Sequence, residues 1–122
     1  MTTYVVLLPG DETVWESATE EQRSAMYARH GEFSRALEER GHKILGGAEL
    51  THSREAKVVR RTGDGTTVTD GPYAETVEQL GGYYLVDSDD LDDLLDVCGI
   101  LADETWPVEV RATVGGDLAE AP

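Results

Sequence analysis

The sequence has a single cysteine, few basic residues and no long hydrophobic run. Cys98 has no partner for a disulfide within the chain, which favours a reducing compartment. Ten lysine and arginine residues stand against 25 aspartate and glutamate residues, and the formal net charge of −15 opposes phosphate backbones and anionic lipid surfaces. The apolar runs are far shorter than a membrane span, and the N-terminus has no signal-peptide pattern. We therefore predict a soluble cytoplasmic protein that binds neither nucleic acid nor membranes.

The sequence also lacks the motifs that hold cofactors and metals. The glycine pairs Gly46-Gly47 and Gly81-Gly82 do not have the spacing of a nucleotide-binding loop. One cysteine and three scattered histidines give no zinc-ligand spacing. The aspartates of residues 87–96 lack the glycine and the closing glutamate of a calcium loop, so they are expected to form a solvated helix face. We expect no cofactor and no metal.

The length of 122 residues suits one domain with one modest hydrophobic core. Residues 4–8 form a short apolar run typical of a central strand. Thr19 and Gln22 match the capping box of a long helix, which Gly41 ends. Glycine turn signals between β-branched residues in 56–69 predict a hairpin. These signals predict both strands and helices within a single domain.

Weaker signals complete the order of elements. Further strands are expected at residues 43–50, 83–86 and 108–114. A loop is expected at 10–17, a helical turn at 76–80, and a second helix after Ser88, with Leu91 and Leu95 in its inward stripe. This order predicts an α+β fold of the ferredoxin-like type, an antiparallel sheet with two helices on one face. The predicted domain spans residues 1–114, and residues 115–122 are predicted to be a disordered acidic tail.

The sheet face away from the helices needs a cover. Without one, the strands would expose apolar side chains together with Trp15, Tyr83, Tyr84 and Trp106. A second copy packed sheet against sheet would cover them, so the sequence predicts a homodimer. Because side chains alternate along a strand, only one of the two adjacent tyrosines can face the helices.

Residues 69–86 (TDGPYAETVEQLGGYYLV) resemble the signature of the YCII-related family, in the branch called DGPF-domain proteins. Shorter matching segments lie at 4–8, 30–33, 45–50, 89–92 and 108–111. The resemblance implies a ferredoxin-like subunit in a dimeric α/β barrel, in a family of mostly uncharacterised proteins. It also implies either a small-molecule enzyme that uses a histidine and an aspartate, or an accessory protein linked to an extracytoplasmic-function sigma factor. Tyr73 departs from the family, which has phenylalanine at that position.

His30 and Asp70 are the candidate catalytic residues. Imidazole titrates near neutral pH, and His30 falls on the inward stripe of the long helix. A carboxylate bonded to one ring nitrogen would fix the tautomer, and the resemblance gives this role to Asp70. Two alternatives stay open, because an inward histidine can be a hydrogen-bonded core residue and an aspartate before glycine is a common turn former.

Four further residues are candidates for ligand binding. Tyr73 and Tyr84 can form the wall of a pocket, and Glu49 adds a carboxylate next to a glycine-rich strand. Arg111 can hold an anion through its fork of donors, although its residue type favours a structural salt bridge over that role. Together with the catalytic pair they suggest a small-molecule-binding dimer with cofactor-independent acid–base chemistry. The alternative is a non-catalytic accessory or regulatory protein that acts through protein contacts.

Overall fold

A computed structural model of the chain describes residues 1–115, so residues 116–122 of the predicted tail lie outside the described residues. The strands are β1 (Thr2–Asp11), β2 (Lys43–Glu49), β3 (Lys57–Thr62), β4 (Gly65–Asp70), β5 (Glu78–Ser88) and β6 (Glu109–Ala112). The helices are α1 (Glu12–Glu16), α2 (Glu20–Glu39) and α3 (Leu91–Cys98), with a 3₁₀ turn, η1 (Ser53–Glu55).

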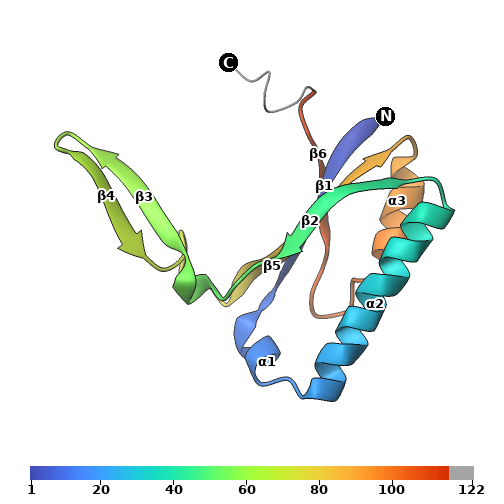
Figure 1. Cartoon of the computed structure of the whole chain (residues 1–122), viewed down its shortest axis with the longest axis horizontal. Coiled ribbons are helices and arrows are strands. Elements are labelled where there is room, and N and C mark those ends of the chain that lie inside the picture. Colours follow the sequence, from blue (N-terminus) through green and yellow to red (C-terminus); the bar gives the residue numbers. More distant parts are fainter. Residues whose placement is uncertain (116–122) are drawn as a thin grey trace.

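A four-stranded antiparallel sheet forms the body of the molecule. Its strand order is β2-β5-β1-β6, so the apolar first strand is central as predicted. Helices α2 and α3 lie against the same face of this sheet (Figure 1). The predicted α+β fold of the ferredoxin-like type is therefore confirmed. We call the other face, which no helix covers, the open face.

The core lies between the sheet and the two long helices. Val6 of β1 and Val86 of β5 meet Phe33 and Leu37 of α2 and Leu94 of α3, and all five side chains are fully buried. Helix α2 begins at the predicted capping box and is followed by Gly41, which has a positive φ of 85°. The capping box and Gly41 thus set the ends of α2, and the buried side chains Phe33 and Leu37 set the face that it turns to the sheet.

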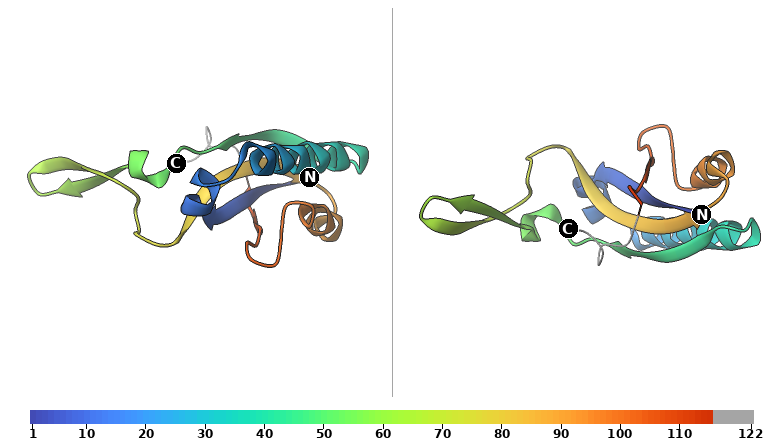
Figure 2. Two further views of the ribbon diagram at one scale, coloured as in Figure 1. Left: turned by 90° about the horizontal axis from the view of Figure 1, so that it is seen from below. Right: turned by 90° about the horizontal axis from the view of Figure 1, so that it is seen from above.

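Strands β3 and β4 form a separate two-stranded sheet, as the turn signals predicted. This hairpin projects from the body on the side opposite to α2 (Figure 1). The end-on views show it extending beyond the sheet and the helices (Figure 2). All residues from 59 to 70 are exposed.

Several local predictions are wrong. Residues 12–16 form the short helix α1 in place of a loop, because the side chain of Asp11 accepts from the Thr13 amide and caps a helix there. The helical turn expected at 76–80 is instead the start of β5, since pairing with the end of β1 overrides local propensity.

The second helix also differs from its prediction. Its N-cap is Asp90, whereas Ser88 is a buried end of β5. Leu91 and Leu95 are 41% and 46% exposed instead of inward. Leu95 follows the buried Leu94 by one residue, which is about 100° around a helix of 3.6 residues per turn.

Candidate functional site

The residues closest to a functional arrangement are His30 of α2 and Tyr84 of β5. Nδ1 of His30 and the hydroxyl oxygen of Tyr84 are 2.6 Å apart. The Tyr84 ring lies on the helix side of the sheet, where its centroid is 5.1 Å from that of the buried Phe33. The prediction that one tyrosine of the pair at 83 and 84 faces the helices is therefore confirmed. Packing against Phe33 holds the hydroxyl at the edge of the core.

Burial sets the protonation states of this pair. Desolvation lowers the pKa of His30, an effect that the charge of Glu49 opposes and that of Arg29 reinforces. Desolvation also raises the pKa of the Tyr84 hydroxyl. At neutral pH the imidazole is neutral and the phenol is protonated. Within residues 1–115 no hydrogen bond engages Nε2 of His30.

Glu49 lies close to the pair, at the end of β2. The hydroxyl of Tyr27 donates to both oxygens of Glu49, at distances of 3.2 and 3.1 Å. Tyr27 precedes His30 by three residues and therefore lies on the same side of α2. Burial and the Glu49 carboxylate together raise the pKa of Tyr27. The group thus contains a neutral base, two phenols and one carboxylate.

Helix α1 supports this group from one side. Trp15 contacts Tyr27 edge to face, with ring centroids 5.6 Å apart. The guanidinium of Arg23 lies 5.3 Å from the centroid of the Trp15 ring and donates to the Trp15 carbonyl oxygen. Trp15 was expected near the uncovered sheet face, but it holds Tyr27 in place.

The structure does not bring Asp70 to His30 within the subunit. Asp70 ends β4 at the base of the hairpin, where it is exposed and bonds the ammonium group of Lys57. That bond lowers the pKa of the Asp70 carboxyl. Tyr73, in the following loop, is exposed as well. The sequence showed the turn chemistry of this loop but not the direction in which the hairpin leaves the body.

Arg111 lies on β6, opposite Val5 of β1. Its side chain is exposed, and within residues 1–115 no ion pair involves it. In the register of the sheet it stands on the open face, away from His30. Neither the salt bridge nor the anion site considered for Arg111 is therefore formed within the described part of the subunit.

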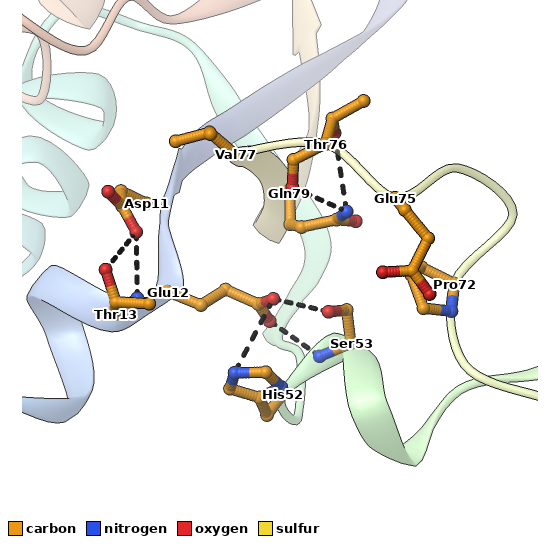
Figure 3. A pocket seen from close by; sticks show the side chains of 10 residues that line it. All are labelled: Asp11, Glu12, Thr13, His52, Ser53, Pro72, Glu75, Thr76, Val77 and Gln79. Carbon is orange, nitrogen blue, oxygen red and sulfur yellow. Dashed lines mark hydrogen bonds and ion pairs between the residues drawn. The ribbon is translucent and has the colours of Figure 1, made fainter.

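A second polar cluster, which the sequence did not indicate, lies beside the loop after β4 (Figure 3). Glu12 accepts from the backbone amide of Ser53 at 2.6 Å and from its hydroxyl. Nδ1 of His52 accepts from the Arg54 amide, so the neutral ring carries its proton on Nε2, which is 3.7 Å from Glu12. These contacts satisfy the carboxylate and fix α1 to η1. We interpret the cluster as a structural clamp.

Two open cavities of about 310 Å³ each adjoin this clamp. The first is lined by polar side chains, among them Glu12, Glu75 and Gln79. The second is more apolar and includes Leu50, Tyr73 and Leu80 in its lining. Both lie at the base of the hairpin, next to the loop that begins with Asp70.

Residues 1–115 contain neither a cluster of metal-ligating side chains nor a helix that could span a membrane. In that part of the chain, no group of three or more histidine, cysteine, aspartate and glutamate side chains is placed to hold a metal ion. Among the helices of the same residues, none has the length and apolar character that a membrane span requires.

Comparisons with known proteins match most of the chain. Residues 2–99 match the family model described as the YCII-related domain. An uncharacterised protein of Rhizobium meliloti (strain 1021) is 35% identical over 111 residues, which cover 88% of this chain and 89% of that protein. The similarity thus extends over almost the full length of both chains.

Proposed function

The chain belongs to the YCII-related domain family, and we propose that it is a homodimer that binds a small organic molecule and moves a proton on it without a cofactor. The observation that carries this proposal is the contact of 2.6 Å between Nδ1 of His30 and the Tyr84 hydroxyl. A lowered pKa keeps His30 neutral near pH 7, which is the state that a general base requires.

The chemistry follows from the tautomer in which Nδ1–H donates to the Tyr84 oxygen. Nε2 then carries the lone pair and takes a proton from an acidic C–H or O–H group of the ligand. The electron pair left behind moves onto a neighbouring ligand oxygen, while the Tyr84 hydroxyl, at the opposite ring nitrogen, accepts from Nδ1–H and so fixes the tautomer and direction of the imidazole. Return of the proton to another atom of the ligand completes an isomerisation. No redox partner is needed.

Glu49 is a positioning and electrostatic residue in this proposal. Its charge raises the pKa of His30 and therefore stabilises the imidazolium that forms when the proton is taken up. Tyr27 holds both carboxylate oxygens and fixes their direction. Asp70, Tyr73 and Arg111 receive no role, because no hydrogen bond or ion pair within residues 1–115 joins them to His30.

The open face of the sheet supports the homodimer. In the strand register, Val5 and Leu7 of β1 share this face with Tyr83 and Leu85 of β5 and Ala48 of β2. These residues form a continuous apolar surface across the three strands, which a soluble chain covers by packing it against a partner. A second copy presents the same surface, so the two open faces can pack against each other about a twofold axis. We also propose that the protein is cytoplasmic, as the sequence predicts.

The test is NMR of the His30 imidazole during titration with small carbonyl and carboxylate compounds. We expect binders to shift the His30 resonances in the wild type and to lose affinity in Tyr84→Phe. The matched control is Tyr83→Phe, which removes the same hydroxyl from the other side of the strand and should bind normally.

Proton transfer has its own readout. A bound ligand with an exchangeable C–H should exchange it with deuterated water in the wild type and not in His30→Gln. If no compound perturbs His30 and both tyrosine variants behave alike, the pair is structural. The result would then favour the accessory protein that acts through protein contacts.

A further inference from the structure

The β3–β4 hairpin has little support within its own subunit. Its strands pair only with each other among the described strands, and a backbone bond from Gly71 to Ala56 closes its base. An isolated two-stranded hairpin is marginally stable in water. A surface that covers one of its faces would therefore stabilise it, and the subunit itself offers none along residues 59–70, which are all exposed.

One face of the hairpin has the composition of a contact surface. Val59 and Val68 are direct cross-strand partners and are 63% and 59% exposed. Arg61 lies two residues from Val59 and so points to the same side. An apolar pair beside a cation fits a partner surface that is apolar and acidic.

The hairpin is weakly basic, with three basic side chains against Asp64 and Asp70, whereas the rest of the chain is strongly acidic. Four of the ten basic residues of the protein lie in or next to β3, namely Arg54, Lys57, Arg60 and Arg61. Arg54 pairs with Glu16 and Lys57 with Asp70, which leaves the two arginines of β3 to act on a partner. The whole chain nevertheless carries 25 acidic residues and a net charge of −15. A second copy of this chain therefore presents the complementary charge.

The direction of the hairpin places it beside such a copy. In Figure 1 the sheet is seen nearly edge-on, with α2 on one side and the hairpin rising on the other, the side of the open face. A copy packed on the open face would lie in the angle between the sheet and the hairpin. Strands of six residues span about 20 Å, whereas packed sheets are about 10 Å apart. The tip of the hairpin would thus pass the partner's sheet and reach its helix layer.

The helix layer carries a matching surface. Leu91 and Leu95 of α3 are 41% and 46% exposed and lie one turn apart. Asp92 and Asp96 follow them directly in the sequence and are exposed too, and Asp96 also pairs with Arg40 at 3.1 Å. This surface is apolar and acidic, which is the composition that the Val59–Val68 pair and Arg61 require.

We propose that the β3–β4 hairpin of each subunit clasps the acidic helix layer of a second copy of this chain. The clasp rests on the homodimer proposed above. It gives the hairpin a binding surface on the partner copy, a contact separate from the packing of the two open faces. It uses apolar contact from Val59 and Val68 and charge attraction from Arg61, which lies on the same face of the hairpin.

Two variants test the clasp by sedimentation equilibrium. The first replaces residues 60–67 by Asn-Gly, a two-residue turn that shortens the hairpin. The second combines Arg60→Glu with Arg61→Glu. We expect each to raise the dimer dissociation constant at least tenfold at low salt, and the loss in the charge variant to shrink at high salt. Circular dichroism and thermal melting verify that the body is folded.

The control is Arg35→Glu, which changes one exposed cation of α2 and leaves the hairpin intact. It is expected not to weaken the dimer, while Arg61→Glu alone should. If the charge variants and the shortened hairpin keep the wild-type dissociation constant, the clasp is wrong and the dimer stands. A wild-type chain that is monomeric at tens of micromolar overturns the dimer and the clasp together.

Crosslinking locates the contact. A photoreactive thiol label on Thr66→Cys sits at the hairpin tip, and the native Cys98 is buried and not labelled in the folded protein. In a mixture of ¹⁴N and ¹⁵N copies, we expect crosslinks from the label to residues 20–39 or 91–98 of the other isotope. Crosslinks confined to a single copy would contradict the clasp.

Discussion

Gly47 lies directly against the ring of Tyr84, its cross-strand partner between β2 and β5. A Cβ added to Gly47 would be 2.5 Å from the carbonyl oxygen of Tyr83 and 3.0 Å from Cδ1 of Tyr84. The missing side chain leaves the space in which the Tyr84 ring reaches His30. The register of β2 also shifts just before Gly46, so the strand is irregular at this glycine pair.

Gly47→Ala should therefore destabilise the protein by about 1–3 kcal/mol, the usual cost of overpacking. The added methyl group must displace Tyr84, so the His30 tautomer should change as well. Urea unfolding measures the first effect, and the ¹⁵N shifts of the His30 ring report the second. Gly46→Ala is the matched control, because a Cβ there meets nothing within 4 Å. Equal stability of the two variants would contradict the close approach.

The fold was predictable where strong local signals agreed with the tertiary structure. The capping box at Thr19 fixed the start of α2, and the turn around residues 63–65 fixed the hairpin. The prediction failed where tertiary contacts decided. Residues 78–80 pair with the end of β1 although no strand pattern marks them. His42, which no sequence pattern places in the core, is buried between β5 and α3.

The candidate site was predictable in part. The stripe of α2 predicted that His30 faces inward, and strand alternation predicted that one of two adjacent tyrosines faces the helices. Which strand register brings Tyr84 to His30 depends on sheet pairing, which no local pattern fixes. The position of Asp70 depends on the path of an exposed loop, and turn chemistry specifies its shape but not its direction.

The stability of the protein should depend on His30 as the pH falls below 7. Burial lowers the pKa of His30 in the folded state, whereas the unfolded residue titrates near 6.5. As pH falls through about 6.5, the unfolded state takes up more protons, so folding becomes less favourable until the folded pKa is reached.

The measurement is the free energy of unfolding of the wild type and of His30→Gln from pH 8 to pH 5. The advantage of the wild type should be constant above pH 7 and decline below it. Carboxylates whose pKa is lowered in the fold, such as Asp93, act at lower pH and are present in both proteins. A difference that is independent of pH would show that the fold does not perturb His30.

His42 should contribute strongly to stability. Nδ1 lies 2.8 Å from the Ser88 hydroxyl, and Nε2 lies 2.7 Å from Asp93, so the buried ring joins the start of β2 to the end of β5 and to α3. His42→Ala leaves a cavity and removes a partner from each group, at an expected cost of about 2–4 kcal/mol in unfolding free energy.

The comparison for this prediction is His52→Ala. His52 is partly exposed and makes one local hydrogen bond, to the Arg54 amide. Its removal should cost about 1 kcal/mol, the typical value for a lost cap. Equal losses in the two variants, measured by denaturant unfolding, would mean that the buried bridge of His42 adds nothing beyond local capping.

Cys98 should be unreactive in the folded protein. It lies on the inner side of α3 with Leu94 and Val97, and burial raises the pKa of its thiol to about 11. Because the thiolate is the reactive form, both burial and the raised pKa suppress attack on a disulfide reagent at pH 8. Ellman's reagent should label it only at the rate of unfolding and completely in denaturant, whereas the exposed position in Thr66→Cys should react within seconds. Rapid labelling of wild-type Cys98 would show that α3 opens from the sheet under native conditions, and the receiving surface of the clasp would then be mobile.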